Sequence, residues 1–182
     1  MVCARPVQNT SHLCKLCRPA YKRAWCIGKR DEALRELIDQ FKFERVGAAR
    51  RELVDLLDQS LPLLPSDVIV VPVPTIAKHR RIRGYGHVEL IAKAFSRKRQ
   101  LIYQEALGRH GQSIQRGASR RERIEQAKLA YQPQYVQIGA TYLLVDDVYT
   151  TGATLEYASQ TLLAGGAKEV WVVALSRQPL EK

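Results

Sequence analysis

Two adjacent aspartates, Asp146 and Asp147, follow the apolar run "YLLV", and the segment "TTGAT" comes shortly after them. The run predicts a buried strand, and the residues after Gly152 have the pattern of a helix. A loop that opens a helix presents unpaired backbone N–H groups and the positive end of the helix dipole, which suits a phosphate group. Threonine hydroxyls add donors, and the glycine lets the backbone approach an anion closely. The sequence therefore predicts a phosphate-binding loop over residues 150–154.

The two carboxylates would repel that phosphate unless they face a different part of the same ligand. Two oxygen acceptors beside a phosphate loop suit the cis 2- and 3-hydroxyls of a ribose, so we expect a ribose 5-phosphate ligand. The alternative is that Asp147 and the threonines only cap the helix, because both residue types are favoured there. A Walker-type loop is excluded because there is no Gly-Lys-Ser/Thr sequence, and the glycine spacing of a dinucleotide fingerprint is missing too.

The segment "LLVDDVYTTGAT" resembles the phosphoribosyl pyrophosphate (PRPP) motif of type I phosphoribosyltransferases. The resemblance implies that Asp146 and Asp147 are the catalytic acidic pair, which binds the ribose hydroxyls. It implies that the 5-phosphate is bound by the loop residues Thr150, Thr151, Gly152, Ala153 and Thr154. Tyr149 stands where many relatives have a small or apolar residue, and we expect it to narrow the mouth of the site.

A cationic stretch follows "VPVPT", which predicts the end of another strand one strand–helix unit earlier. We expect the residues "IAKHRRIRGYG" to form a loop that binds the pyrophosphate of PRPP through Lys78, Arg80, Arg81 and Arg83. A Mg²⁺ ion would bind together with PRPP, mainly through ligand oxygens and water, so few protein ligands are expected. The alternative is a solvated run of charge that binds no ligand.

A wider set of segments resembles the ComF family of competence-associated, type I phosphoribosyltransferase-like proteins, over about residues 30–177. These segments are "RRIRGYGHVELIAKAF", "QSIQRGASRRERIEQAKLAY" and the PRPP motif. Relatives typically read Arg-Gly-Phe-Asn-Gln where this chain has "RGYGH", residues 83–87. The family's mobile loop is similar to a segment that contains Gln115, Ser119, Arg120, Glu122 and Arg123. We expect His79, His87 and His110 at the surface.

Strands and helices alternate along the chain, which predicts a mainly parallel sheet with helices on both faces. Helical patterns begin at residue 31 and run over about 48–60, 87–98 and 152–166, and strands are expected near 67–74, 140–147 and 168–177. The PRPP motif implies the type I phosphoribosyltransferase fold, with roughly five strands by analogy. We assign residues 31–182 to this phosphoribosyltransferase-like domain.

All four cysteines lie in the first 26 residues: Cys3, Cys14, Cys17 and Cys26. In a cytosolic chain such clustering favours a metal over disulfides. The ComF resemblance implies a zinc-ribbon-like module over residues 1–30 with a structural Zn²⁺, which needs four ligands. One Cys-x-x-Cys pair is present, but the second is broken. His12 is an alternative to Cys3, and reduced free thiols are the alternative to zinc.

The net charge of +11 is unevenly distributed, and residues 1–30 contain seven Lys or Arg and no acidic residue. Residues 68–128 contain fourteen basic and four acidic side chains. Such an excess attracts phosphate-rich partners. No apolar run approaches the roughly 20 residues that span a bilayer, and the first residues lack a secretion signal. We therefore expect a cytoplasmic protein that does not contact membranes.

Two functional hypotheses follow. In the first, the protein is an enzyme that binds PRPP with Mg²⁺ and transfers the phosphoribosyl group; the intact acidic pair and phosphate loop favour it. In the second, it is a non-enzymatic accessory of DNA uptake in natural competence, which binds single-stranded DNA and other DNA-uptake proteins. The acid-free first 30 residues favour this second hypothesis.

Overall fold

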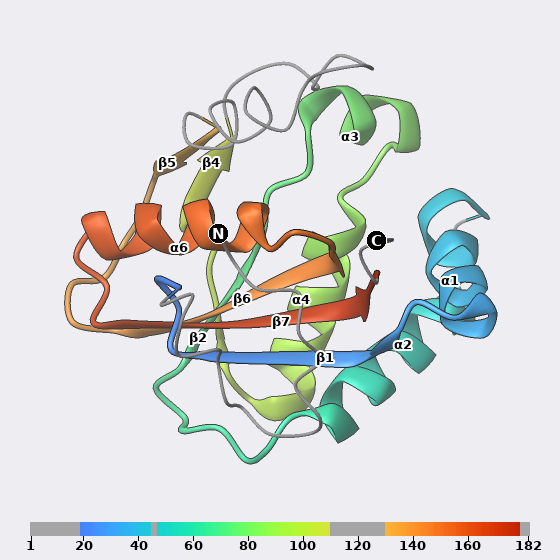
Figure 1. Ribbon diagram of the computed structural model, residues 1–182, viewed down its shortest axis with the longest axis horizontal. Helices are drawn as coiled ribbons and strands as arrows, with labels where there is room; N and C mark the ends of the chain where they lie inside the picture. The colour runs from blue at the N-terminus through green and yellow to red at the C-terminus, as the bar shows by residue number, and fades with distance from the viewer. Residues whose placement is uncertain (1–18, 45–46, 110–129, 179–182) are drawn as a thin grey trace.

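The structure is a computed structural model, which describes residues 19–44, 47–109 and 130–178 (Figure 1). Its centre is a five-stranded sheet in the order β1-β7-β6-β2-β3, and every neighbouring pair of strands is parallel. The strands of this sheet are β1 (Arg23–Lys29), β2 (Ile69–Pro72), β3 (Ile102–Tyr103), β6 (Thr141–Tyr149) and β7 (Glu169–Arg177). The predicted fold class, a mainly parallel sheet flanked by helices, is confirmed.

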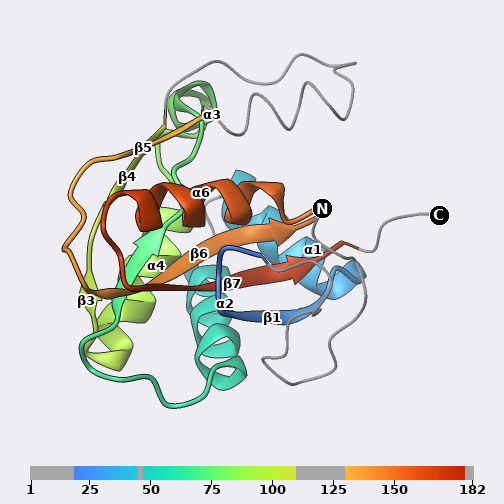
Figure 2. The same cartoon turned by 60° about the vertical axis from the view of Figure 1, so that its left-hand side comes forward.

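Helices cover both faces of the sheet (Figure 1). One face is covered by α1 (Glu32–Asp39), the π-helix η1 (Gln40–Glu44), α2 (Gly47–Ser60) and α4 (His87–Arg99). The other face is covered by α6 (Ala153–Ala164) and by the antiparallel ribbon of β4 (Leu107–Arg109) and β5 (Tyr131–Pro133). Helix α3 (Ala77–Arg83) stands out from the sheet on the same side as α6 (Figure 2). Within the described ranges, every helix is too short or too polar to span a lipid bilayer.

Strand β6 is buried on both faces, which explains why its sequence is a continuous apolar run. Tyr142 and Leu144 pack into the core beneath α6, whereas Leu143 and Val145 pack into the core beneath α2 and α4. All four side chains are completely buried. Since successive side chains of a strand point to opposite faces, residues 146 and 147 also point to opposite faces of the sheet.

The structure corrects two expectations about the elements near the aspartates. Strand β6 does not end with the acidic pair, near residue 147, but continues to Tyr149, because β7 runs beside it and pairs Asp146 with Ala174 and Tyr149 with Arg177. The cationic stretch expected as a loop forms helix α3 instead. Lys and Arg favour helices, and no glycine interrupts this run before Gly84, which ends the helix at φ +80°.

A third difference concerns the first 30 residues, where no strand was predicted. Arg23–Lys29 form β1, an edge strand that pairs with β7 over its whole length. The end of the predicted 1–30 module therefore belongs to the central sheet. Cys3, His12, Cys14 and Cys17 lie outside the described residues, as do His110 and the segment predicted to resemble the family's mobile loop.

Candidate functional site

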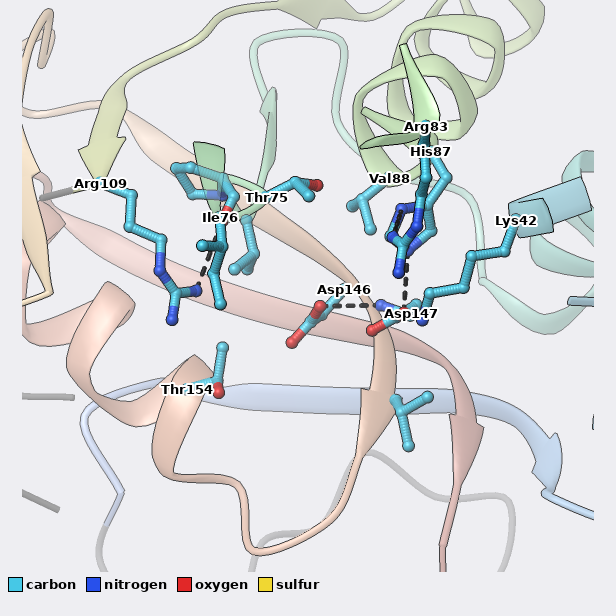
Figure 3. A pocket seen from close by; sticks show the side chains of 13 residues that line it. Lys42, Thr75, Ile76, Arg83, His87, Val88, Arg109, Asp146, Asp147 and Thr154 are labelled. Carbon is cyan, nitrogen blue, oxygen red and sulfur yellow. Dashed lines mark hydrogen bonds and ion pairs between the residues drawn. The ribbon is translucent and has the colours of Figure 1, made fainter. Parts of the chain in front are cut away.

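A pocket of about 250 Å³ opens at the carboxyl ends of β2 and β6 (Figure 3). In open parallel sheets, ligands usually bind in such crevices beyond the strand ends. The polar residues that line it are Lys42, Thr75, Arg83, His87, Arg109, Asp146, Asp147 and Thr154. Four of these eight residues were predicted site residues, and the other four, Lys42, Thr75, His87 and Arg109, were not.

Asp147 points toward η1 and α4, and its carboxylate contacts one side chain from each of them. The Lys42 ammonium lies 2.6 Å from its Oδ2 atom, and His87 Nε2 lies 2.8 Å from the same atom. Burial alone would raise the pKa of Asp147, but the hydrogen bonds and charges of these two side chains together hold it well below its usual range. Asp147 is therefore a carboxylate, and it does not cap α6 as the simpler interpretation required.

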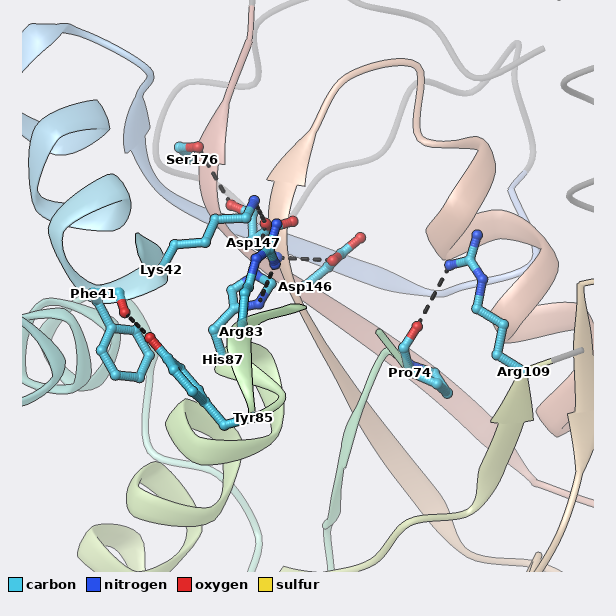
Figure 4. Close-up of polar contacts among 10 residues, drawn as sticks. All are labelled: Phe41, Lys42, Pro74, Arg83, Tyr85, His87, Arg109, Asp146, Asp147 and Ser176. Atoms are coloured by element: carbon cyan, nitrogen blue, oxygen red, sulfur yellow. Dashed lines mark hydrogen bonds and ion pairs between the residues drawn. The ribbon is translucent and has the colours of Figure 1, made fainter. Parts of the chain in front are cut away.

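His87 is the first residue of α4 and is buried, so the expectation that it lies at the surface was wrong. Its Nδ1 atom lies 3.2 Å from Arg83 Nη1 (Figure 4). A guanidinium can only donate and a carboxylate can only accept, so a neutral ring with its proton on Nε2 suits both contacts. The signal in the sequence was spacing: His87 lies four residues before Ile91 and eight before Phe95, on the buried face of α4.

Lys42 comes from the π-helix η1 and was not predicted. A lysine that follows an amphipathic helical pattern is ordinarily solvent-exposed, whereas the Lys42 side chain is only 17% exposed. The Tyr85 hydroxyl donates a hydrogen bond to the carbonyl oxygen of Phe41, the residue before it (Figure 4). This contact joins η1 to the turn between α3 and α4. No local pattern in the sequence reveals it.

Asp146 points to the opposite face, toward α6 and β4. Its Oδ1 atom accepts a hydrogen bond from the Asp147 backbone N–H at 2.8 Å, and the residue is only 8% exposed. Burial, and after it the negative charge of Asp147, raise the pKa of Asp146 well above its usual value. The two carboxyl groups are therefore adjacent in sequence but differ in how readily they bind a proton.

Arg109 lies on the Asp146 side of the pocket and was also missed, because it stands at the end of the short strand β4. Its guanidinium donates to the Tyr131 hydroxyl at 3.0 Å and to the Pro74 carbonyl at 3.5 Å. The guanidinium carbon also lies 5.2 Å from the centre of the Tyr131 ring. Burial is the main reason that the pKa of Tyr131 rises to about 12, so its hydroxyl stays protonated. These contacts hold the Arg109 guanidinium in the pocket that Asp146 also lines.

The predicted phosphate loop leads into α6, as expected, but only some of its residues are near the pocket. Thr154 lines the pocket, whereas Thr150 and Thr151 are exposed. The N-cap residue is Gly152, at φ +75°, and the Ala153 N–H donates to Thr151 Oγ1 at a long 3.4 Å. Of the five predicted loop residues, all of which the structure describes, only Thr154 lines the pocket, and the amino end of α6 faces the pocket through it.

Tyr149 was expected to narrow the mouth of the site, but its ring lies over Gly152 instead. A Cβ atom added to that glycine would come within 2.5 Å of the Tyr149 hydroxyl and 2.8 Å of its ring. The Tyr149 hydroxyl lies 3.2 Å from the Tyr21 hydroxyl, which ties the loop to the segment before β1. Tyr149 thus packs against the glycine turn and is not one of the residues that line the pocket.

Of the four cations predicted to bind pyrophosphate, the structure brings Arg83 into the pocket. Arg80 is exposed and lies 3.4 Å from the carboxylate of Glu89, and Arg81 is exposed as well. Lys78 is part of α3, and its side chain lies outside the description. The helix separates these residues, since a helix turns each successive side chain by about 100°.

Cys26 lies in β1, where its Sγ donates to the Gly28 carbonyl at 3.2 Å. Burial raises the pKa of this thiol to about 11. Among the residues that the structure describes, no three His, Cys, Asp or Glu side chains form a group that could hold a metal ion. The other three predicted ligands lie outside that part of the chain, so the zinc site remains a prediction.

Three bacterial proteins are similar to this chain over most of its length. Competence protein F of Haemophilus influenzae is 29% identical over 96% of this chain and 82% of its own length. DNA utilization protein YhgH of Shigella flexneri is 30% identical over 96% of this chain and 82% of its own length. Competence protein ComFC of Streptococcus pneumoniae is 26% identical over 81% of this chain, which spans 64% of that protein. No family model matches the chain.

Solved structures with a similar arrangement include an allosteric regulatory enzyme of purine biosynthesis and an adenine phosphoribosyltransferase from Thermoanaerobacter pseudethanolicus. The first is 18% identical, with a TM-score of 0.49 over 75% of this chain and 30% of the other. The second is 11% identical, with a TM-score of 0.47 over 74% of this chain and 83% of the other.

Proposed function

This chain belongs to the family of competence protein F, ComFC and the DNA utilization protein YhgH, and we propose that its pocket binds PRPP and transfers the phosphoribosyl group. One observation carries the proposal. The carboxyl groups of Asp146 and Asp147 face one pocket, between the amino end of α6 and cationic side chains on two sides. A ligand that suits this arrangement has hydroxyl groups in its middle and anionic groups at its ends.

The amino end of α6 would bind the 5-phosphate through backbone N–H groups and the Thr154 hydroxyl. Asp147, as a carboxylate, would accept hydrogen bonds from the ribose hydroxyls, and Asp146 would accept or donate according to its protonation. Arg83 would stabilise the negative charge that develops on the departing pyrophosphate. The bond between C1 and the pyrophosphate oxygen breaks, and a nucleophile of the acceptor forms the new bond to C1.

The residues around the pocket fit the Mg²⁺ ion that the PRPP motif implies. Asp146, Thr75 and Thr154 offer oxygen atoms, which are the ligands that Mg²⁺ takes in proteins, usually together with water and ligand phosphates. The Thr75 hydroxyl is buried and has no hydrogen-bond partner among the described residues, so it is available to a bound group. When bound, the ion would neutralise charge on the pyrophosphate.

Calorimetry with PRPP and Mg²⁺ tests the proposal, and two simpler sugars make the test specific. We expect PRPP to bind, and ribose 5-phosphate to bind at least about 10-fold tighter than 2-deoxyribose 5-phosphate, because the latter lacks one of the hydroxyls that the acidic pair is proposed to bind. Absence of PRPP binding would refute the proposal. Equal affinity for the two sugars would contradict the role of the carboxylates.

A role in handling DNA is a second candidate, which the names of the relatives and one surface feature support. Helix α3 stands out from the sheet (Figure 2). Its residues Arg80 and Arg81 are exposed. Such a cationic projection suits the phosphates of single-stranded DNA. We propose that α3 contacts the DNA backbone outside the pocket.

Changing Arg80 and Arg81 together to glutamine is expected to weaken binding of a single-stranded oligonucleotide. The slope of log affinity against log salt should fall by about 0.7 for each arginine that contacts a phosphate. Fluorescence anisotropy over a range of salt concentrations measures this slope. Arg97→Gln is the matched control, because Arg97 is also exposed but lies at the far end of α4. An unchanged slope in the double variant would remove α3 from the DNA interface.

A further inference from the structure

Tyr85, in the turn after α3, and His87, at the start of α4, both contact the surroundings of Lys42. Tyr85 donates its hydroxyl hydrogen bond to the Phe41 carbonyl, one residue before Lys42. His87 donates to the same Asp147 oxygen that Lys42 binds. Figure 4 shows Lys42 from η1 and His87 from α4 meeting at Asp147, whereas Tyr85, in the turn before α4, reaches the Phe41 carbonyl. The contacts of both side chains therefore surround one lysine.

The π-helix gives Lys42 its direction. A π-turn has a wider ring of hydrogen bonds than an α-turn and is often found at functional sites. Phe41 is 4% exposed, and its ring centre lies 5.8 Å from that of Tyr85. With Phe41 buried and its carbonyl bound by Tyr85, the next residue is directed toward the pocket, where the ammonium reaches Asp147. The π-turn and the hydrogen bond from Tyr85 thus together fix the position of Lys42.

The charge around Lys42 leaves it able to bind an anion. Asp147 carries one negative charge, whereas Lys42 and Arg83 carry one positive charge each on this side of the pocket. An ammonium has three donors, and its bond to Asp147 uses one of them. The side chain is mostly buried, so a second contact with a ligand would form where water screens charge weakly.

The position of Lys42 selects one end of a ligand. The amino end of α6 lies on the Asp146 side of β6, and Lys42 lies on the Asp147 side (Figure 3). We infer that Lys42 binds the anionic group of the ligand that is remote from α6, and that Tyr85 is a positioning residue that acts through Lys42. This inference rests on the proposed function, and it means that Lys42 binds the diphosphate of PRPP.

The first test compares ligands with and without that diphosphate, using the whole chain and calorimetry. Lys42→Met keeps the length of the side chain and removes its charge. We expect it to weaken binding of PRPP and of inorganic pyrophosphate at least about 10-fold, the effect of losing one charged hydrogen bond. Binding of ribose 5-phosphate should change little. Lys42→Arg should restore most of the affinity for PRPP.

The second test is a double-mutant cycle, which separates positioning from general loss of structure. Tyr85→Phe keeps the ring and should weaken PRPP binding about fivefold, the value of one neutral hydrogen bond. In the Lys42→Met background the same change should have almost no further effect on affinity. Tyr103→Phe is the matched control, because it removes a tyrosine hydroxyl that donates to Glu105, away from the pocket.

The outcomes distinguish this inference from the proposed function. If the wild type binds PRPP and Lys42→Met binds it equally well, the role of Lys42 is refuted and the proposed function stands. An equal loss for ribose 5-phosphate and PRPP would refute the assignment to the diphosphate end. Additive effects of the Tyr85 and Lys42 variants would refute positioning through Lys42. If the wild type binds neither PRPP nor ribose 5-phosphate, both proposals fail.

Discussion

Replacing Asp147 with asparagine is expected to weaken PRPP binding by about two orders of magnitude, which corresponds to losing charged hydrogen bonds in a partly buried site. The amide keeps the size of the side chain but removes the charge that Lys42 and His87 contact at 2.6 and 2.8 Å. It also loses an acceptor for the ribose hydroxyls. Calorimetry with PRPP and Mg²⁺ measures the effect.

The same substitution is expected to lower the free energy of unfolding by about 2–3 kcal/mol, because it leaves the ammonium of Lys42 without its carboxylate in a largely buried position. Denaturant unfolding followed by circular dichroism checks this value. Titrations for binding must therefore be made where the variant is fully folded. Wild-type affinity in Asp147→Asn would contradict the role of the carboxylate, whatever its stability.

Asp146→Asn is the matched control, because the same chemical change is made one residue earlier on the other face of β6. The amide oxygen of this variant remains an acceptor for the Asp147 N–H, so we expect a clearly smaller loss of affinity than in Asp147→Asn. Similar losses in both variants would show that the two carboxyl groups act alike.

The pH dependence of stability should separate the two residues further. The pKa of Asp147 is lowered by folding, so its contribution to stability is present above the unfolded pKa of about 3.9 and is lost as pH falls through the folded value. The pKa of Asp146 is raised by folding, so its contribution is present below about 3.9 and is lost as pH rises through the folded value. Asp146→Asn should therefore gain stability relative to the wild type as pH rises, and Asp147→Asn should lose it.

Gly152→Ala is expected to have the second largest effect, on both stability and binding. Gly152 has a φ of +75°, which costs a residue with a Cβ about 1 kcal/mol or more. The added Cβ would also come within 2.8 Å of the Tyr149 ring, so the loop or the ring must move. Because this turn sets the amino end of α6, we expect a loss of at least about 10-fold in affinity for ribose 5-phosphate.

Gly139→Ala separates backbone strain from steric conflict. Gly139 has a nearly identical φ of +78°, but a Cβ there would meet nothing within 4 Å. We expect it to lower the free energy of unfolding by about 1 kcal/mol and to leave ligand affinity unchanged. Thermal unfolding and calorimetry of both variants make the comparison. Equal stability losses in the two variants would show that Tyr149 does not constrain the glycine turn.

The sequence alone determined the features that lie close together along the chain. The apolar run of β6, the adjacent aspartates, Gly152 and the start of α6 occupy one short segment, so local periodicity and helix-start chemistry predict their order and their shared location. The amphipathic helices over about 48–60 and 87–98 were predicted for the same reason. A parallel sheet then follows, because strands alternate with helices and both faces of β6 must be covered.

Only the tertiary structure decided which distant side chains complete the site. Lys42 is 105 residues from Asp147 in sequence and His87 is 60 residues from it, and both reach the same oxygen because η1 and α4 pack on one face of β6. Arg109 lies on the other face of β6. The strand β1 likewise exists because β7 supplies its hydrogen-bond partners. The periodicity of a segment predicts which face of that helix or strand is buried. It does not predict which other elements pack against that face, because this depends on the packing of the whole chain.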